Sequence, residues 1–306
     1  MFKALFRNQL GRIQHAPYEY ALARIGLAFV ALDSTWRIIH TNDEKGLREP
    51  HGFASIGAKS AEDLGAIGDF VVWANVSPGV ISAWFVLFAC LTALYAVGVA
   101  PLLTSSGMLV LHIICGTFYM SQGAMHHGQQ IVDLALFGQV LASFWAKVMY
   151  RESIGLLAPD SQRHRDLSMF FIPQMIAASY VITGLTKLEK SDGMWILRSP
   201  NFAIQFEKNR LMAYHNDLQP VDDALNQWMI DFLVNYSWLG ILMFGFVLFL
   251  EFGAFLALFN RILLLLFGIS IVAMHINIGM IMKLHFPNNQ WLVFIFFVNA
   301  PFWILF

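Results

Sequence analysis

The stretch YSWLGILMFGFVLFLEFGAFLALFNRILLLLFGISIVAMHINIGMIMK, Tyr236–Lys283, decides the class of fold. It is apolar over almost its whole length, and Asn260-Arg261 divides it into two segments. A helix rises about 1.5 Å per residue and the hydrocarbon layer is about 30 Å thick, so about 20 apolar residues cross a membrane. Each segment therefore predicts one transmembrane helix, and the break predicts a tight turn.

The composition of the whole chain extends this prediction. Of the 306 residues, 58% are hydrophobic, 15% are aromatic and only 13% are charged, whereas about 25% of a soluble domain is charged. The apolar excess therefore has to face lipid. The formal net charge is -1 and the basic residues are scattered, which excludes nucleic acid as a partner because phosphate binding needs a basic stripe.

The same length criterion, applied along the chain, predicts an all-α, polytopic bundle of about eight transmembrane helices in a single domain, residues 1–306. A further tight turn is expected at residues 98–101. The long connections 39–77 and 189–235 are rich in charged and aromatic residues, which predicts short interfacial helices. The expected spans are Tyr18–Ile39, Pro78–Ala100, Leu102–Gln122, Ile131–Met149, Leu167–Leu188, Tyr236–Phe259, Arg261–Lys283 and Gln290–Phe306.

Basic residues near the predicted helix ends suggest an orientation. Short loops on the cytoplasmic side carry an excess of Lys and Arg. Such residues precede the first span and surround the loop after the fourth, so we expect a cytoplasmic N-terminus in a bacterial inner membrane: Lys3, Arg7, Arg12, Lys147, Arg151, Arg163 and Arg165. The third, fifth and seventh spans then end on the outer face.

Polar residues in these spans are the candidates for a functional site. A charge at membrane depth costs about 2.5–3.5 kcal/mol on insertion scales unless it has a partner or reaches water. Lys187 ends the fifth span and Glu251 lies within the sixth. The seventh span carries His275 and Asn277, which lie two residues apart and so point to different helical faces. His126 and His127 follow the third span.

Each candidate has a structural alternative. Lys187 can extend its aliphatic stem to the lipid headgroups. Glu251 can pair with Arg24, Arg37 or a buried imidazole, because an acid within a bundle has to be neutral or paired. The two histidines can belong to a hydrated loop or to a hydrogen-bonded helix end, and His112 is expected to be a core group with satisfied hydrogen bonds.

We find no sequence motif for a metal or nucleotide cofactor or for a serine nucleophile. No two histidines lie four residues apart, the helical spacing that would bring several imidazoles to one metal centre. We therefore predict no metal site. The sequence also lacks a Walker loop, a dinucleotide glycine fingerprint and a nucleophile elbow. A transporter is disfavoured because matching halves do not show paired Gly/Pro-interrupted helices.

The pattern Tyr180-x-x-x-Gly184-x-x-Lys187-Leu188, followed by Trp195, resembles the membrane core of vitamin K-dependent gamma-carboxylases and the wider horizontally transferred transmembrane domain (HTTM) family. Further similarities follow in order along the chain. A histidine before the fourth span corresponds to His126 or His127, and an acidic residue in an apolar helix corresponds to Glu251. A basic residue between the next two spans corresponds to Arg261, and a histidine followed by Asn, Ser or Gln corresponds to His275 with Asn277.

This resemblance implies a function. Lys187 would be the catalytic base that removes a proton from a reduced vitamin K or menaquinol, with His126 or His127 binding the quinol or a developing oxyanion. The expected quinone-binding residues are Tyr180, Trp195, Glu251, His275 and Asn277. A lysine acts as a base only when neutral, and loss of water favours that form. Membrane lipid and quinone are the expected partners, with membrane proteins as further candidates.

Two departures from the carboxylases limit this prediction. The chain is expected to lack the large extracytoplasmic domain that helps to hold the peptide substrate, and Thr186 stands where the carboxylases have another lysine. Two functions therefore remain open. One is a quinol-linked carboxylase or epoxidase acting on an unknown substrate. The other is a non-catalytic protein that binds quinone or lipid, or a subunit of a larger membrane complex.

Overall fold

The computed structural model describes residues 14–44, 65–66, 68–70, 73, 78–121, 127–150, 161–198, 201–218, 224–282 and 284–305. All regular structure within these ranges is helical, which confirms the all-α prediction. Contacts divide the chain into two compact units. We call Gln9–Ile176 with Asn299–Phe306 the N-terminal unit, and Met1–Asn8 with Ala177–Val298 the C-terminal unit. Helix α8, Gln162–Lys190, contributes residues to both.

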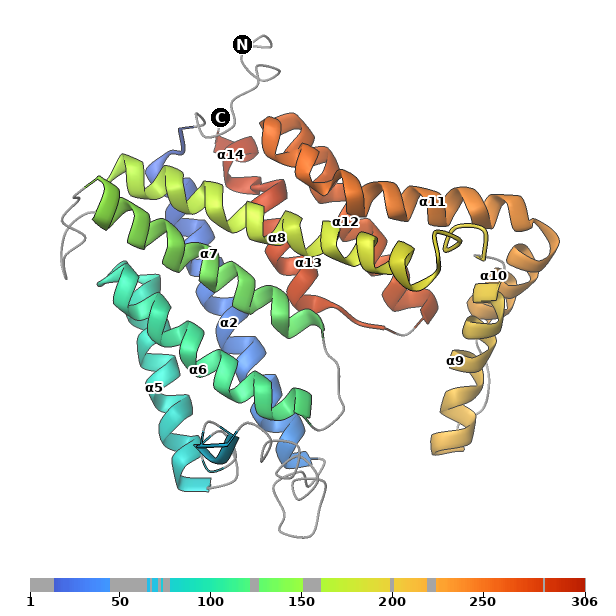
Figure 1. The fold of residues 1–306 in the computed structure, drawn as a ribbon, viewed down its shortest axis with the longest axis horizontal. Helices are drawn as coiled ribbons and strands as arrows, with labels where there is room; N and C mark the ends of the chain where they lie inside the picture. Colours follow the sequence, from blue (N-terminus) through green and yellow to red (C-terminus); the bar gives the residue numbers. More distant parts are fainter. Residues whose placement is uncertain are drawn as a thin grey trace. The chain divides into compact units, whose positions relative to one another are not determined.

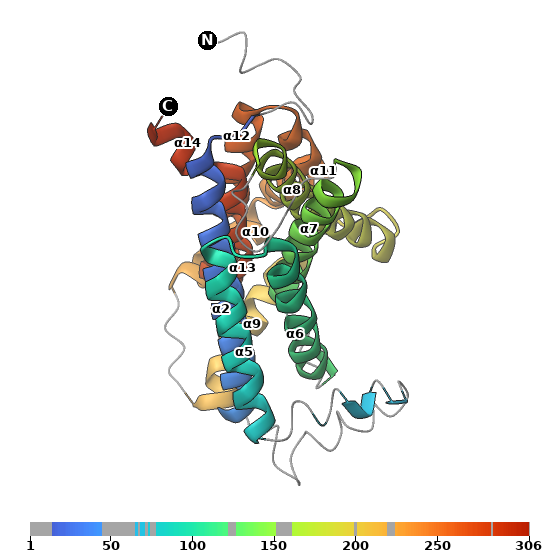
Figure 2. The ribbon, with the colours of Figure 1, turned by 90° about the vertical axis from the view of Figure 1, so that its left-hand side faces the viewer.

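The N-terminal unit is built from long helices. They are α2 (Pro17–Glu44), α5 (Pro78–Ala96), α6 (Pro101–Ser121), α7 (His127–Met149), the first part of α8, and the short α14 (Ala300–Leu305). Helix α2 packs against α5 and α6, and α6 packs against α7 (Figures 1 and 2). Helices α2, α5 and α6 each begin with proline, whose fixed φ suits the first helical position and whose missing N–H costs nothing there.

The turn between α5 and α6 occurs where the sequence predicts it. Gly98 adopts φ +86° and Ala100 adopts φ 44°, in the left-handed region that glycine enters without a steric cost. Arg24 covers this turn: its Nε donates to the carbonyl of Ala96 at 3.3 Å, and a Cβ at position 98 would lie 2.7 Å from its guanidinium. The arginine thus binds the C-terminal end of α5, the end that favours positive charge.

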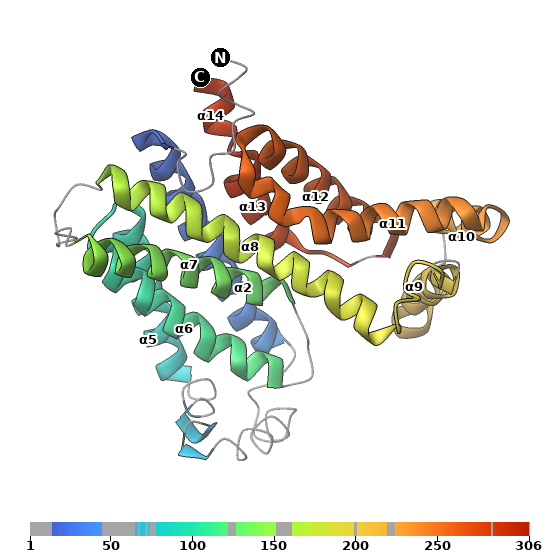
Figure 3. The same cartoon turned by 45° about the horizontal axis from the view of Figure 1, so that its top comes forward.

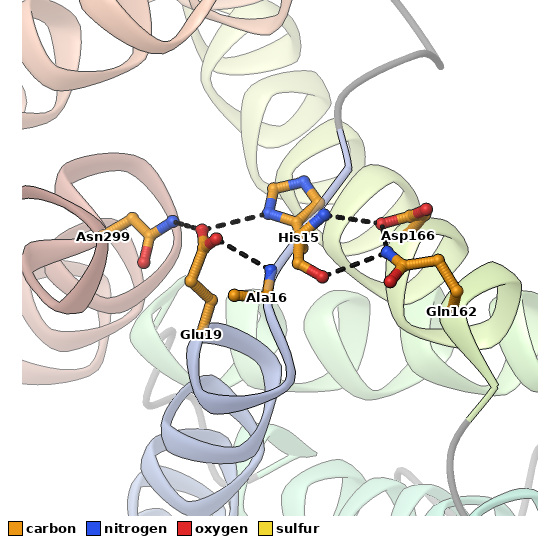
Figure 4. Close-up of polar contacts among 6 residues, drawn as sticks. All are labelled: His15, Ala16, Glu19, Gln162, Asp166 and Asn299. Carbon is orange, nitrogen blue, oxygen red and sulfur yellow. Dashed lines mark hydrogen bonds and ion pairs between the residues drawn. The ribbon is translucent and has the colours of Figure 1, made fainter. Parts of the chain in front are cut away.

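A buried carboxylate fixes the start of α2 (Figure 4). Glu19 Oε1 accepts the backbone N–H of Ala16 at 2.9 Å, as the glutamate at helix position N3 of a capping box does. Its Oε2 accepts from Asn299 Nδ2 at 2.8 Å and lies 3.2 Å from His15 Nδ1. The backbone N–H of His15 donates to Asp166 Oδ1 of α8 at 2.7 Å. Three separate segments of the N-terminal unit therefore meet at one cluster.

A second buried network lies between the helices of this unit. Gln139 of α7 is fully buried. Its Oε1 accepts from two tyrosine hydroxyls and its Nε2 donates to two serine hydroxyls, so both ends of the amide are used. The partners are Tyr20 at 3.3 Å, Tyr95 at 3.0 Å, Ser143 at 3.0 Å and Ser168 at 3.1 Å. Such fully bonded networks make the packing of their helices specific.

The C-terminal unit holds the rest of α8 and seven further elements. These are α9 (Phe202–Asp217), α10 (Ala224–Asn235), α11 (Ser237–Gly253), the 3-10 segment η2 (Ala254–Phe259), α12 (Arg261–Met282), α13 (Pro287–Val293) and the π-helical η3 (Phe294–Val298). Helix α11 lies beside α12 (Figure 3), and α13 with η3 also packs on α12. Gly268 allows this approach, since a Cβ there would lie 2.9 Å from Phe297.

The predicted break at Asn260-Arg261 is confirmed. Segment η2 ends at Phe259, Asn260 is extended, and α12 begins at Arg261. The Asn260 side chain accepts the backbone N–H of Leu263 at 2.9 Å, which satisfies one of the free donors at the start of a helix.

Within the described residues, five helical segments are long and apolar enough to cross a membrane. They are Gly79–Ala96, Gly128–Met149, Gln162–Lys190, Ser237–Phe259 and Arg261–Met282. Three further predicted spans do not meet this criterion. The first, in α2, contains four charged residues between Glu19 and Arg37; the apolar part of α6 is the shorter Pro101–Thr117; and the last is split into α13, η3 and α14. Helices α9 and α10 occupy one of the connections where interfacial helices were predicted.

Replacing Glu19 tests the cluster at the start of α2. The Glu19→Ala variant loses the helix cap and leaves the amide of Asn299 without this acceptor, so we expect the free energy of unfolding to fall by about 1–2 kcal/mol. Thermal unfolding in detergent measures the change. The matched control is Glu189→Ala, which removes an exposed carboxylate and should leave the melting temperature nearly unchanged. Equal melting temperatures for the two variants would contradict this role of Glu19.

Candidate functional site

Lys187 and Glu251 form an ion pair between α8 and α11. The ammonium Nζ of Lys187 donates to Oε1 of Glu251. The carboxylate side chain is 5% exposed and the lysine side chain 27% exposed. Lys187 also lies over the ring of Trp195, with Nζ 4.8 Å from its centroid, a cation–π contact. The lysine is thus held by two partners within the C-terminal unit.

The local sequence explains how α8 presents this lysine. Gly184, one turn earlier on the same helical face, packs directly on Glu251: a Cβ there would meet the Cβ of Glu251 and the ring of Phe252 at 3.4 Å each. The small residue therefore brings α8 and α11 close enough for the ion pair. Tyr180, Gly184 and Lys187 follow an i, i+4, i+7 spacing, which aligns them along one face of the helix.

The end of α8 then turns the chain so that Trp195 lies against Lys187. The N–H of Gly193 donates to the carbonyl of Leu188 at 2.8 Å, and that of Asp192 to Glu189 at 3.2 Å. With Asp192 at φ 52°, these two bonds form a Schellman motif. The acidic and glycine residues that follow the helix in the sequence are therefore the residues that end it.

A second polar pair contacts the same face of α8. The hydroxyl of Tyr180 lies 2.8 Å from Nε2 of His275 on α12, and both residues are buried. The side chain of Asn289, in α13, also hydrogen-bonds to Tyr180. The two pairs lie along one face of α8, because Tyr180 and Lys187 are seven residues, about two helical turns, apart. We call Tyr180, Lys187, Glu251, His275 and Asn289 the polar cluster.

The polar cluster retains unused hydrogen-bonding capacity. Among the residues that the structure describes, Oε2 of Glu251, Nδ1 of His275 and Oδ1 of Asn289 are buried without a hydrogen-bond partner. A buried polar atom without a partner costs about 1–3 kcal/mol. Three such atoms in one cluster are typical of a binding site, where a polar ligand makes the missing bonds.

Five of the residues predicted from the sequence therefore lie in or against one cluster: Tyr180, Lys187, Trp195, Glu251 and His275. The partner of Glu251 is Lys187, so the interpretation that it pairs with Arg24, Arg37 or an imidazole was wrong. Asn277 is exposed and donates to the carbonyl of Ala273 at 2.8 Å, which agrees with its expected separation from His275. It does not belong to the cluster.

The tandem histidines cannot be placed with this cluster. His126 lies outside the described residues, and His127 begins α7 of the N-terminal unit without a described side chain. Their proposed role stays a prediction. Sequence reasoning missed Asn289, although the polar pair Asn288-Asn289 at the start of an otherwise apolar segment was a signal that could have identified it.

The N-terminal unit contains another arrangement with catalytic residue types. His112 Nδ1 lies 2.6 Å from Asp133 Oδ1, and its Nε2 lies 3.0 Å from Ser34 Oγ. This order of atoms resembles an acid–base triad. Ser34 is only 1% exposed and His112 is fully buried, so no substrate reaches the serine in this conformation. Both ring nitrogens have partners, which confirms the expectation of a satisfied core histidine.

Comparisons with known proteins assign neither a family nor a function, so the functional assignment depends on the geometry of the site. No family model, no curated protein and no solved structure matches the chain. In the described part of the chain, no group of three or more His, Cys, Asp or Glu residues is arranged to hold a metal ion. The fold and composition define a class: an all-α chain with several apolar helices compatible with an integral membrane protein.

Substitutions at Gly184 test the close approach of α8 and α11. In Gly184→Ala the added Cβ fits at van der Waals distance, and alanine favours the helix by about 1 kcal/mol. We expect unchanged or higher stability. Gly184→Leu inserts a side chain larger than the available space and should lower the free energy of unfolding by about 1–3 kcal/mol.

Thermal unfolding of the two purified variants measures this difference. The alanine variant is the matched control, because it changes the same backbone position without forcing the helices apart. A leucine variant as stable as the alanine variant would show that α8 and α11 do not pack closely at this residue.

Proposed function

We propose that this integral membrane protein binds the polar ring of a lipid-soluble quinol at the polar cluster and removes a proton from its hydroxyl. The Lys187–Glu251 pair is the acid–base group in this proposal, and sequence analysis assigned the proton-accepting role to Lys187. The quinol belongs to the vitamin K or menaquinol class, as the resemblance to the vitamin K-dependent carboxylases suggests.

The observation that carries the proposal is the set of buried polar atoms without partners. Glu251 offers an acceptor at Oε2 and His275 a second hydrogen-bonding atom at Nδ1, both on helical segments that are long and apolar enough to cross a membrane. A ring hydroxyl is able both to donate and to accept hydrogen bonds, so it satisfies such groups. Trp195 adds an aromatic surface beside the lysine. The residues present therefore fit a quinol.

Each residue has a distinct part in this proposal. Glu251 and Lys187 receive the proton and balance the charge that its removal leaves. His275 hydrogen-bonds the ligand, and Tyr180 orients the imidazole through its contact with Nε2. When bound, a quinol supplies an acidic hydroxyl and reducing electrons. The coupled reaction, carboxylation or epoxidation of a second substrate, remains part of the proposal.

The proposal also includes the finer membrane arrangement. It comprises a bundle of about eight spans in the inner membrane of a bacterium, a cytoplasmic N-terminus, and further membrane proteins as candidate partners. The scattered basic residues near helix ends support this orientation.

A non-catalytic role is the second candidate, and the ion pair itself favours it. Lys187 and Glu251 neutralise each other and join α8 to α11 beside Gly184, as a purely structural pair would. In that case the polar cluster binds a quinone or a lipid headgroup without proton transfer, or the protein serves as a subunit of a larger membrane complex.

Lipid extraction of the purified protein tests quinone binding. We expect the wild-type protein to retain a naphthoquinone after purification in mild detergent, and Lys187→Ala to retain about tenfold less. The reason is that Lys187→Ala removes the hydrogen bond that holds the Glu251 carboxylate in the site; a hydrogen bond to a charged group contributes about 1.5–3 kcal/mol, and 1.4 kcal/mol corresponds to a tenfold change in affinity. Mass spectrometry of the extract measures quinone per mole of protein.

The control is Lys190→Ala, which removes an exposed lysine from the same helix end and should leave the quinone content at the wild-type value. Thermal unfolding shows that both variants are folded. Equal quinone content in Lys187→Ala and wild type would refute binding at the polar cluster. Enrichment of a phospholipid instead of quinone, lost on Lys187→Ala, would support the non-catalytic candidate.

A further inference from the structure

We infer that Glu251 is the group that takes the proton from the bound hydroxyl, and that Lys187 is a positioning cation which holds the carboxylate and balances the charge. This inference rests on the proposed function and deepens it, since it reassigns the role of base within the same site. It comes from the contacts that each of the two side chains makes.

Lys187 makes the contacts of an ammonium. A charged lysine has three N–H donors and no acceptor. Its Nζ donates to Glu251 Oε1 and lies over the face of Trp195, and an aromatic face attracts a cation. Both contacts suit a charged ammonium, which has no lone pair with which to accept a proton.

Glu251 retains a free acceptor. Its Oε1 faces the lysine, while Oε2 is buried and has no hydrogen-bond partner among the described residues. A carboxylate has lone pairs on both oxygens. Oε2 is therefore the basic atom of the pair that is open to a donor, and a ligand hydroxyl is such a donor.

The neighbouring histidine supplies the complementary group. The Asn289 side chain bonds to Tyr180, and its Oδ1 has no partner, so its NH₂ group is the donor. Because the Tyr180 hydroxyl already accepts this bond, we assign its hydrogen to the bond with Nε2 of His275. We assign the hydrogen of the imidazole to Nδ1 from this network. His275 then donates to the ligand oxygen from which Glu251 takes the proton.

The step conserves atoms and charge. The O–H bond of the ligand breaks, an O–H bond forms at Oε2 of Glu251, and the electron pair stays on the ligand oxygen. Before transfer the cluster contains one ammonium and one carboxylate. After transfer it contains the same ammonium, a neutral carboxylic acid and one negative ligand oxygen. The net charge of the cluster with its ligand therefore stays at zero, whereas an uncompensated buried charge would be strongly destabilising.

An ionisable probe separates the two assignments. The probe is 1-naphthol, a ring with one hydroxyl that cannot be oxidised to a quinone by simple two-electron loss, and its absorbance distinguishes the neutral form from the anion. The full-length protein in lipid nanodiscs is titrated with 1-naphthol at constant pH. Binding is followed by equilibrium dialysis, and ionisation by the absorbance of the bound fraction.

Substitutions of Lys187 and Glu251 are expected to affect the ionisation of bound 1-naphthol differently. Lys187→Arg keeps a cation that is able to pair with a carboxylate but does not lose its proton in proteins. We expect it to bind and ionise 1-naphthol to within about threefold of wild type. Glu251→Gln keeps the shape and cannot accept the proton. We expect it to bind the probe while the ionised fraction falls about tenfold or more.

The controls and the contradicting results differ from those that test the proposed function. Glu189→Gln, on the exposed surface of α8, should behave as wild type, and thermal unfolding shows that each variant is folded. Ionisation that survives in Glu251→Gln, or that disappears in Lys187→Arg, would overturn the assignment of the base while leaving quinol binding intact. Binding without ionisation in wild type would also overturn it. Absence of 1-naphthol binding to wild type would refute the proposed function together with this inference.

Discussion

The ion pair between Lys187 and Glu251 is the interaction on which the polar cluster depends. A charged group among apolar helices is stable only with a partner, because removal from water costs several kcal/mol per ion. Gly184 permits the approach of the two helices, and the Schellman turn after Lys190 brings Trp195 to the other side of the ammonium. The packing of α8 on α11, the end of α8 and the compensation of charge therefore all involve the Lys187 side chain.

The polar cluster differs from the two bonded networks of the N-terminal unit in how fully its buried groups are hydrogen-bonded. In the N-terminal unit, Gln139 uses both ends of its amide and His112 uses both ring nitrogens. Such networks hold helices together and leave little capacity for a ligand. In the C-terminal unit, Glu251 and His275 each have one bonded atom and one buried atom without a partner in the described residues. This contrast between the polar cluster and the two bonded networks is the reason for choosing the polar cluster as the candidate site; single buried atoms without a partner among the described residues also occur in the N-terminal unit, at Gln129 Oε1 and Gln174 Nε2.

The sequence predicted the helical class and much of the candidate site. Apolar segments of sufficient length identified the helices, and Gly98 and Asn260 identified turns through their conformational preferences. The motif Tyr180-x-x-x-Gly184-x-x-Lys187, followed by Trp195, identified two residues of the polar cluster and the tryptophan beside it. These features are local, so a single segment contains the information.

Features that depend on distant segments were not predictable in the same way. The partner of Glu251 is set by the packing of α8 on α11, and three candidate bases were equally consistent with the sequence. Charged residues in α2 have partners within the bundle, such as Asn299 for Glu19, so composition alone did not show which helices face lipid. Asn289 approaches Tyr180 only because α13 folds back beside α12.

A double-mutant cycle on the ion pair tests the central claim most directly. The free energy of unfolding is measured for wild type, Lys187→Met, Glu251→Gln and the double variant in one detergent. If the two side chains are paired, each single change leaves an unpaired polar group and the double variant recovers stability, with a coupling energy of about 1 kcal/mol or more. Effects that add to within about 0.5 kcal/mol would show that Lys187 and Glu251 do not interact, and would remove the basis for the candidate site.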